Sequence, residues 1–132
     1  MAEPVSLVDI GPTVLDLVGL PRPPGQNGRS LASSVLERKP PPDRMVLAEL
    51  IADRNIKRNL VAGLIPGWQI IKDLDANTYE LYSLAFDPGM QSNRMEGEPE
   101  VAERLRAQLA AQIDVELTPL APRAAKKTPK KK

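Results

Sequence analysis

The chain has 132 residues, enough for one domain of ordinary size, and an aromatic content of 3% means that any core is aliphatic. It contains no cysteine and no histidine, which excludes disulfides, thiolate chemistry, Cys-bound zinc and a histidine general base. The net charge of +1 is uneven, because six basic residues and no acid follow Glu116, leaving 12 basic against 17 acidic residues (about −5) in residues 1–116. An acidic body with a basic tail is not a basic binding face, so we do not expect a nucleic acid partner.

The N-terminal region predicts a short helix from Pro12 to Val18. Pro12 suits the first turn of a helix, where its missing N–H would be unpaired anyway, and Asp9 or Gly11 can cap it. Gly19 can end the helix in a left-handed conformation. The helix carries an aliphatic stripe, formed by Val14, Leu15, Leu17 and Val18. About two turns are too few for stability without tertiary packing, so this stripe needs a surface to pack on.

Proline-rich segments follow this helix. Residues 21–28 predict a loop, residues 30–36 predict a second short helix capped by Ser30, and residues 37–43 predict a surface connection. We therefore expect residues 1–44 to form an N-terminal helix and a proline-rich linker.

The pattern changes to short strands at Met45. Strands are expected over residues 45–51, 57–65, 68–74 and 78–84, with turns at Pro66-Gly67 and residues 75–77. Four short consecutive strands predict an antiparallel meander. In the last strand, alternation should place Tyr79, Leu81 and Ala85 on one face, and Glu80, Tyr82 and Leu84 on the other. Asp87-Pro88-Gly89 should end that strand in a turn.

The longest helix is expected from Pro99 to about Val115. An aliphatic stripe recurs at helical spacing, formed by Val101, Leu105, Leu109 and Gln112 or Ile113, and should lie on the sheet. The predicted fold class is α+β, with a small four-stranded antiparallel sheet packed by this C-terminal helix over residues 45–116. Residues 117–132 predict a disordered basic tail.

Four stretches together resemble the C-terminal end of the sulfatase family, in the alkaline-phosphatase-like superfamily. They are "VSLVDIGPTVLDLVGLP" (5–21), "GRSLASSVL" (28–36), "IPGWQIIKDL" (65–74) and "YELYSLAFDPGMQSN" (79–93), in this order. The resemblance implies that residues 1–44 are the end of a large α/β domain and that residues 45–116 are the C-terminal subdomain. The sequence departs from the family at Gln69, Ser83 and Met90, where Lys, Asp and Glu are frequent, and we interpret these as changes at surface positions.

The same resemblance implies a catalytic centre that this chain does not contain. A complete sulfatase carries a Cys or Ser in a Cys/Ser-x-Pro-x-Arg motif that becomes formylglycine, and Asp and Asn ligands for a divalent cation, usually calcium. It also places His and Lys on the sulfate, where they stabilise developing charge. None of this set is recognisable here, so we assign no catalytic, cofactor-binding or metal-binding residue and expect no cofactor in this chain. The chain alone is expected to be inactive.

Three acidic or amide side chains near one turn raise the alternative of a calcium loop. Asp73, Asp75 and Asn77 match the start of an EF-hand loop, but Thr78 and Leu84 stand where Gly and Glu are required. A hairpin turn is therefore the favoured interpretation.

Two further residues have both functional and structural interpretations. Asp9 could be a metal ligand, but a helix cap is favoured because Asp is common at such positions. Trp68 could line a substrate rim, but a lone Trp in a strand is more often part of the core.

Two classes of function remain open. The chain is either a C-terminal fragment of a sulfuric-ester hydrolase or a stand-alone interaction module whose basic tail, "KKTPKKK", binds an anionic partner. Its partner would be the missing N-terminal sulfatase domain or a second copy, because the helix stripe would otherwise lie in water. No apolar run reaches the ~18 residues of a membrane span. No signal peptide is recognisable, so the protein is expected in the cytoplasm if Met1 is the true start.

Overall fold

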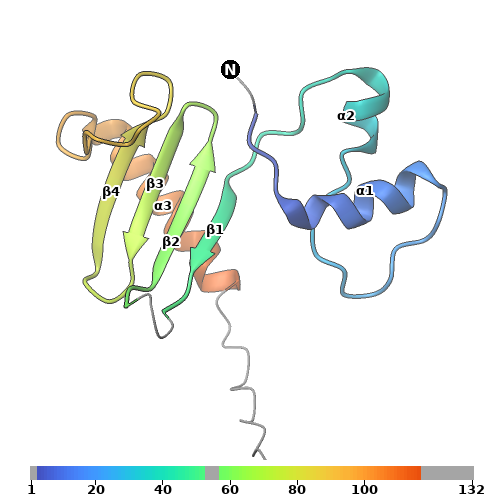
Figure 1. The fold of residues 1–132 in the computed structure, drawn as a ribbon, viewed down its shortest axis with the longest axis horizontal. Coiled ribbons are helices and arrows are strands. Elements are labelled where there is room, and N and C mark those ends of the chain that lie inside the picture. The colour runs from blue at the N-terminus through green and yellow to red at the C-terminus, as the bar shows by residue number, and fades with distance from the viewer. Residues whose placement is uncertain (1–2, 53–56, 117–132) are drawn as a thin grey trace, which may run out of the picture.

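The computed structural model describes residues 3–52 and 57–116, and these form two parts that lie side by side (Figure 1). The first part, the N-terminal lobe, comprises residues 3–44. The second part, the sheet–helix unit, begins at Met45 and ends with the long C-terminal helix. The predicted basic tail lies outside the described residues.

The sheet–helix unit contains the predicted antiparallel meander. Its strands are β1 (Val46–Leu50), β2 (Leu60–Ile65), β3 (Trp68–Asp73) and β4 (Thr78–Ser83), in the spatial order β1-β2-β3-β4. All three pairings are antiparallel. Gly67 and Asn77 make the two tight turns possible, since both have a positive φ, of 78° and 53°. The predicted α+β fold class is therefore confirmed.

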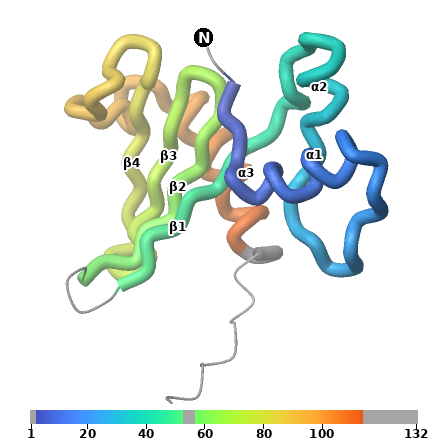
Figure 2. Tube along the Cα trace, turned by 45° about the vertical axis from the view of Figure 1, so that its right-hand side comes forward, coloured from blue at the N-terminus to red at the C-terminus, as the bar shows by residue number. Residues whose placement is uncertain are grey.

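The helix α3 (Pro99–Glu116) covers one face of this sheet (Figures 1 and 2). The contact is aliphatic, with Val61, Ile70 and Leu81 from the sheet packed against Ala102, Leu105, Leu109 and Ile113 from the helix. The predicted stripe is confirmed at Leu105 and Leu109, which are fully buried. Val101 is only half-buried, and Ala102 supplies the buried contact one residue later. Trp68 packs against this core as expected.

Gly63 allows the helix to approach the sheet. A Cβ at this position would lie 2.5 Å from the sulfur of Met45 and 3.2 Å from a methyl carbon of Leu109. The absence of a side chain therefore makes room for Met45 and Leu109, which close the core at the β1 end.

The loop after β4 is fixed by polar contacts with its own strand. The Leu81 N–H donates to Asn93 Oδ1 over 3.1 Å, and the Arg94 N–H donates to the Leu81 carbonyl over 2.7 Å. One carboxylate oxygen of Asp87 accepts the backbone N–H groups of Gln91 and Ser92, both over 2.8 Å. The predicted Asp-Pro-Gly turn is thus an ordered structure.

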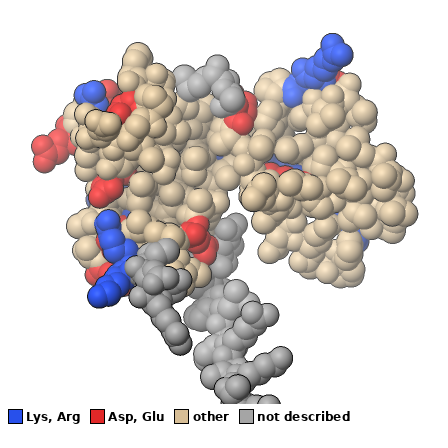
Figure 3. Space-filling view, in the orientation of Figure 1, with Lys and Arg blue, Asp and Glu red and all other residues tan. Residues whose placement is uncertain are grey.

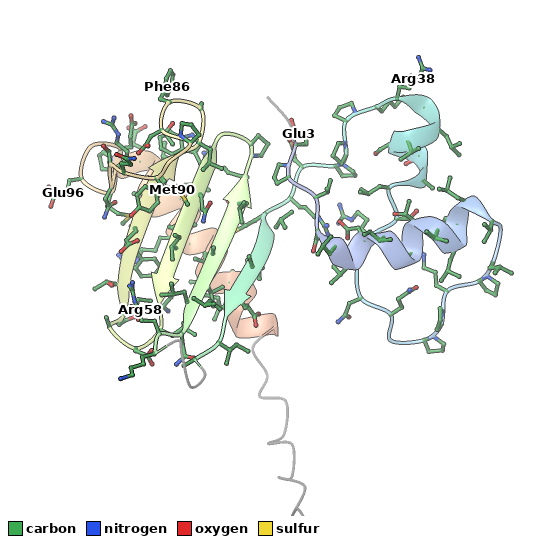
Figure 4. All side chains as sticks on the ribbon, viewed as in Figure 1. Glu3, Arg38, Arg58, Phe86, Met90 and Glu96 are labelled. Carbon is green, nitrogen blue, oxygen red and sulfur yellow. The ribbon has the colours of Figure 1, made fainter. Side chains whose placement is uncertain are left out.

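One residue of this region differs from expectation, and a second is unusually exposed for an aromatic side chain. Ser83, interpreted from the family departures as a surface position, is buried, because it ends β4 on the helix-covered face opposite Trp68. Phe86, the only Phe of the chain, is 90% exposed and points away from the sheet (Figure 4).

The N-terminal lobe contains a 3-10 turn, η1 (Leu7–Asp9), and two short helices, α1 (Ile10–Leu17) and α2 (Ala32–Glu37). Helix α1 begins two residues before the predicted Pro12. Its end is as predicted: Gly19 has a φ of 72°, and the Leu20 N–H donates to the Leu15 carbonyl over 2.9 Å.

The predicted cap of the second helix was wrong by one residue. Leu31, not Ser30, occupies the N-cap of α2, and no side chain caps that helix. The Ser30 hydroxyl instead accepts the Ala32 N–H over 3.2 Å. Ser30 therefore still satisfies one backbone donor of the first turn.

Candidate docking surface

The carboxylate of Asp9 holds three separate segments of the chain together. Asp9 is 1% exposed, and its Oδ2 accepts the Ser6 N–H over 3.1 Å while Oδ1 accepts the Arg29 N–H over 2.9 Å. The Arg44 guanidinium, just before β1, forms an ion pair with Oδ2. Asp9 thus joins the start of the lobe to its own loop and to the sheet–helix unit.

The expected role of Asp9 as a helix cap is confirmed only in part, because its side chain accepts the Ser6 N–H at the start of η1 and does not cap α1. Asp9 stands at the N-cap of α1, but its side chain makes no capping bond to that helix. Its two oxygens are used by backbone donors and by an arginine, an arrangement that neutralises a buried charge. Within the described residues, no group of three or more His, Cys, Asp or Glu could hold a metal ion.

Two backbone contacts extend the network to the loop before α2. The Thr13 hydroxyl donates to the Asp9 carbonyl, and it accepts the Leu31 N–H over 2.9 Å. Gly28 packs directly on η1, because a Cβ there would lie 2.1 Å from the Val8 carbonyl oxygen. Its φ of 97° is also a conformation that favours glycine. We refer to Ser6, Asp9, Thr13, Arg29 and Arg44 as the Asp9 cluster.

The lobe that this cluster assembles has almost no apolar core. Apart from Asp9, Pro12 is the only buried residue in η1 and α1. Ten large aliphatic side chains are instead 44–84% exposed, and we call this set the aliphatic surface: Val5, Leu7, Val8, Ile10, Val14, Leu17, Val18, Leu20, Val35 and Leu36. Figure 3 shows this part of the molecule as largely uncharged, with basic residues gathered at one end.

Helix α1 carries the central part of this surface. Val14 lies four residues after Ile10, and Leu17 and Val18 lie three and four residues after Val14, which places all four on one side of the helix. An amphipathic helix normally turns such a stripe toward a core. Here the stripe faces water, with Val14 at 50% and Val18 at 61% exposure. Leu15, predicted as part of the same stripe, is half-buried.

A groove lined by both apolar and charged side chains lies between the lobe and α3. Two hollows of about 590 and 550 Å³ share four lining residues, Arg44, Met45, Ala111 and Gln112. Opposite charges line it, with Arg29 and Arg104 among the bases and Asp43 and Glu49 among the acids. The groove therefore lies at the junction between the two parts of the molecule.

The suspected calcium loop is a hairpin turn. Asp73 Oδ1 accepts the N–H groups of Asp75 and Ala76, both over 2.9 Å, and Arg58 donates to Oδ2 over 2.8 Å. The Ala76 bond, followed by the Arg58 contact, holds the pKa of Asp73 below its usual value. The Asp75 carboxylate accepts from Asn59. Both carboxylates therefore stabilise the turn.

Comparison with solved structures identifies the fold. A protein of Bacteroides thetaiotaomicron VPI-5482 described as a sulfatase aligns at 25% identity with a TM-score of 0.68, and a 2-O GAG sulfatase aligns at 25% identity with a TM-score of 0.70. Each alignment covers 81% of this chain. The fold is sulfatase-like.

The chain spans only about a quarter of these sulfatases. It covers 24% of the length of both, which agrees with the predicted resemblance to a C-terminal portion alone. A third structure, solved in complex with D-glucosamine-2-N,6-O-disulfate, has the same fold at 20% identity and a TM-score of 0.63. No protein-family model and no curated protein matches the sequence. No helix in the described part of the chain is long and apolar enough to cross a membrane.

Proposed function

We propose that this chain is the C-terminal part of a sulfuric-ester hydrolase and that it has no activity alone. The observation that carries the proposal is the sulfatase-like fold over 81% of this chain against 24% of the matched structures. A sulfatase needs a formylglycine precursor and a divalent cation site. A chain without cysteine and without a Ser-x-Pro-x-Arg motif carries no such precursor, and its described residues include no group of three or more His, Cys, Asp or Glu that could hold the cation.

The aliphatic surface is where the remaining part of the hydrolase would dock. A monomeric protein rarely exposes a continuous apolar area of this kind without a partner. The α1 stripe has the spacing of a helix that packs on a larger body, and the lobe supplies no such body itself. The Asp9 cluster would hold the lobe in place for that contact. Its role is to position, not to catalyse.

Activity measurements test the first part of this proposal. Purified residues 1–132 should hydrolyse no 4-methylumbelliferyl sulfate above a buffer blank, with or without calcium. The coding DNA upstream or beside this chain should encode a polypeptide with a Cys/Ser-x-Pro-x-Arg motif, and co-expression of the two should give a sulfatase. Turnover that co-purifies with the chain alone would overturn the proposal.

A double variant tests the docking surface. Val14→Ser with Val18→Ser removes two exposed side chains, so it should leave the fold intact and weaken co-purification with the catalytic polypeptide at least tenfold. Phe86→Ser is the matched control, since Phe86 is exposed but lies far from the lobe, at the end of the sheet (Figure 4). Equal binding of all three proteins would show that the aliphatic surface is not the contact.

A further inference from the structure

The loop between α1 and α2 contains the only Asn-Gly pair of the sequence, Asn27-Gly28. The chain leaves the end of α1 and returns to its start, where Gly28 packs on η1 (Figure 1). Asn27 is exposed and lies in irregular backbone. Among the described residues, neither the side-chain amide of Asn27 nor the Gly28 N–H takes part in a hydrogen bond. Both groups are therefore available to react with each other.

An Asn that is followed by Gly can lose its side-chain nitrogen without an enzyme. The Gly28 backbone nitrogen gives up its proton to water and attacks Cγ of Asn27. A bond forms between these two atoms, the Cγ–Nδ2 bond breaks, and Nδ2 leaves as ammonia, so the product is a succinimide. Glycine favours this step because it has no side chain to hinder the approach. Water then opens the ring, and its addition at Cγ gives aspartate, whereas addition at the main-chain carbonyl carbon gives isoaspartate.

Three other asparagines of the described chain are less suited to this reaction. The side-chain amide of Asn59 donates to the Asp75 carboxylate over 3.1 Å. The amide oxygen of Asn93 accepts a backbone N–H over 3.1 Å, and the nitrogen that would attack, that of Arg94, donates to a carbonyl over 2.7 Å. Asn77 precedes a β-branched threonine, which hinders the approach. These three residues provide a comparison within the same molecule.

Both neighbours of Asn27 are fixed to the N-terminal lobe. The side chain of Gln26 lies against α1, because a Cβ on Gly11 would come within 2.8 Å of Gln26 Nε2. Gly28 lies so close to η1 that a Cβ there would be 2.1 Å from the Val8 carbonyl oxygen. In isoaspartate the main chain runs through Cβ and Cγ, which inserts an extra atom between the Cα of residue 27 and the next nitrogen. A longer chain between two fixed neighbours must displace at least one of them.

We propose that Asn27-Gly28 is a spontaneous deamidation site and that its isoaspartate product releases the lobe from the Asp9 cluster. The connection runs through the residues that follow Gly28. The Arg29 N–H donates to Asp9 Oδ1, and the Leu31 N–H donates to the Thr13 hydroxyl, both over 2.9 Å. A shift of Gly28 moves both donors away, and a buried acceptor that loses its donor is destabilised. The aliphatic surface would then lose its fixed shape as the protein ages, whatever partner it binds.

Incubation of the full chain at neutral pH tests the chemical step, and it requires no catalytic partner. Peptide mapping, with isoaspartate labelled by an isoaspartyl methyltransferase, should find at least about tenfold more conversion at residue 27 than at Asn59, Asn77 or Asn93. Asn27→Gln is the matched variant, because it keeps an exposed amide but would have to close a larger ring, and it should stay unlabelled at this position. Conversion at residue 27 that is no faster than at the other three asparagines would overturn the proposal.

Hydrogen exchange of the separated isoaspartate form tests the structural step. The N–H groups of Arg29 and Leu31 should lose protection at least about tenfold, while those of β2 and β3 keep theirs. Freshly purified Asn27→Asp carries the same charge on a backbone of normal length, so its protection should stay within about twofold of the wild type. An isoaspartate form with wild-type protection, or an Asn27→Asp variant that loses as much, would show that backbone length at residue 27 does not control the lobe.

Discussion

Replacing Asp9 by Asn should release the N-terminal lobe from the sheet–helix unit. The variant keeps the shape of the side chain but removes the charge that pairs with Arg44 and leaves one oxygen for two backbone donors. Breaking a buried pair by removing one partner costs about 3–5 kcal/mol. Arg44 keeps 25% of its side chain exposed and can regain water, so we expect a cost at or just below the lower end of that range, about 2–3 kcal/mol.

Hydrogen exchange is the suitable assay, because the loss should be local. The N–H groups of Arg29 and Leu31 should lose protection in the variant, while the N–H groups of β2 and β3 should keep theirs. Asp16→Asn is the matched control, since Asp16 pairs with Arg22 on the surface of the same lobe and should change little. Equal protection in the Asp9 and Asp16 variants would refute the view that Asp9 assembles the lobe.

Three further predictions concern stability. Leu105→Asp should lower the free energy of unfolding, measured in denaturant, by several kcal/mol, because it places a charge in a fully buried contact. A loss below ~0.5 kcal/mol would show that the helix does not pack there. Gly28→Ala should unfold the lobe, which circular dichroism would show as a loss of helical signal. Gly25→Ala is the control, because Gly25 has a similar φ but open space around it, so this variant should cost only backbone strain. Equal effects of the two variants would show that the close contact of Gly28 with η1 is not important. The pKa of Asp73 is lowered, first by the hydrogen bond from the Ala76 N–H, so its contribution to stability is present above pH ~4 and is lost as the pH falls further. Asp73→Asn should therefore weaken the dependence of the melting temperature on pH in this acid range. An unchanged dependence would contradict this role of Asp73.

The sheet–helix unit could be predicted from local patterns. Each strand is bounded by Gly, Pro, Asp or Asn, and the α3 stripe recurs at helical spacing, so each element is specified within a few residues of itself. The error at Ser83 has a different origin. A small polar residue reads as exposed, but the position faces the helix because the register of β4 is set by Leu81 and Tyr79.

The Asp9 cluster could not be predicted from local sequence patterns. The partners of Asp9 lie 20 and 35 residues further along the chain, so no local periodicity connects them. The sequence held one signal for this cluster: Asp9, Thr13 and Gly28 all lie in two of the stretches that resemble the sulfatase family.

The closure of one sheet edge limits how this protein can misassemble. Asn93 and Arg94 occupy the outward N–H and carbonyl of Leu81, and the Ser83 carbonyl accepts the N–H groups of Phe86 and Asp87, so β4 offers little to an incoming strand. In the described sheet, β1 is the other edge. A sheet with two open edges can add strands without limit and grow into a fibre, whereas a sheet with one open edge stops after a single pairing. Strand exchange through β1 would therefore end at two chains.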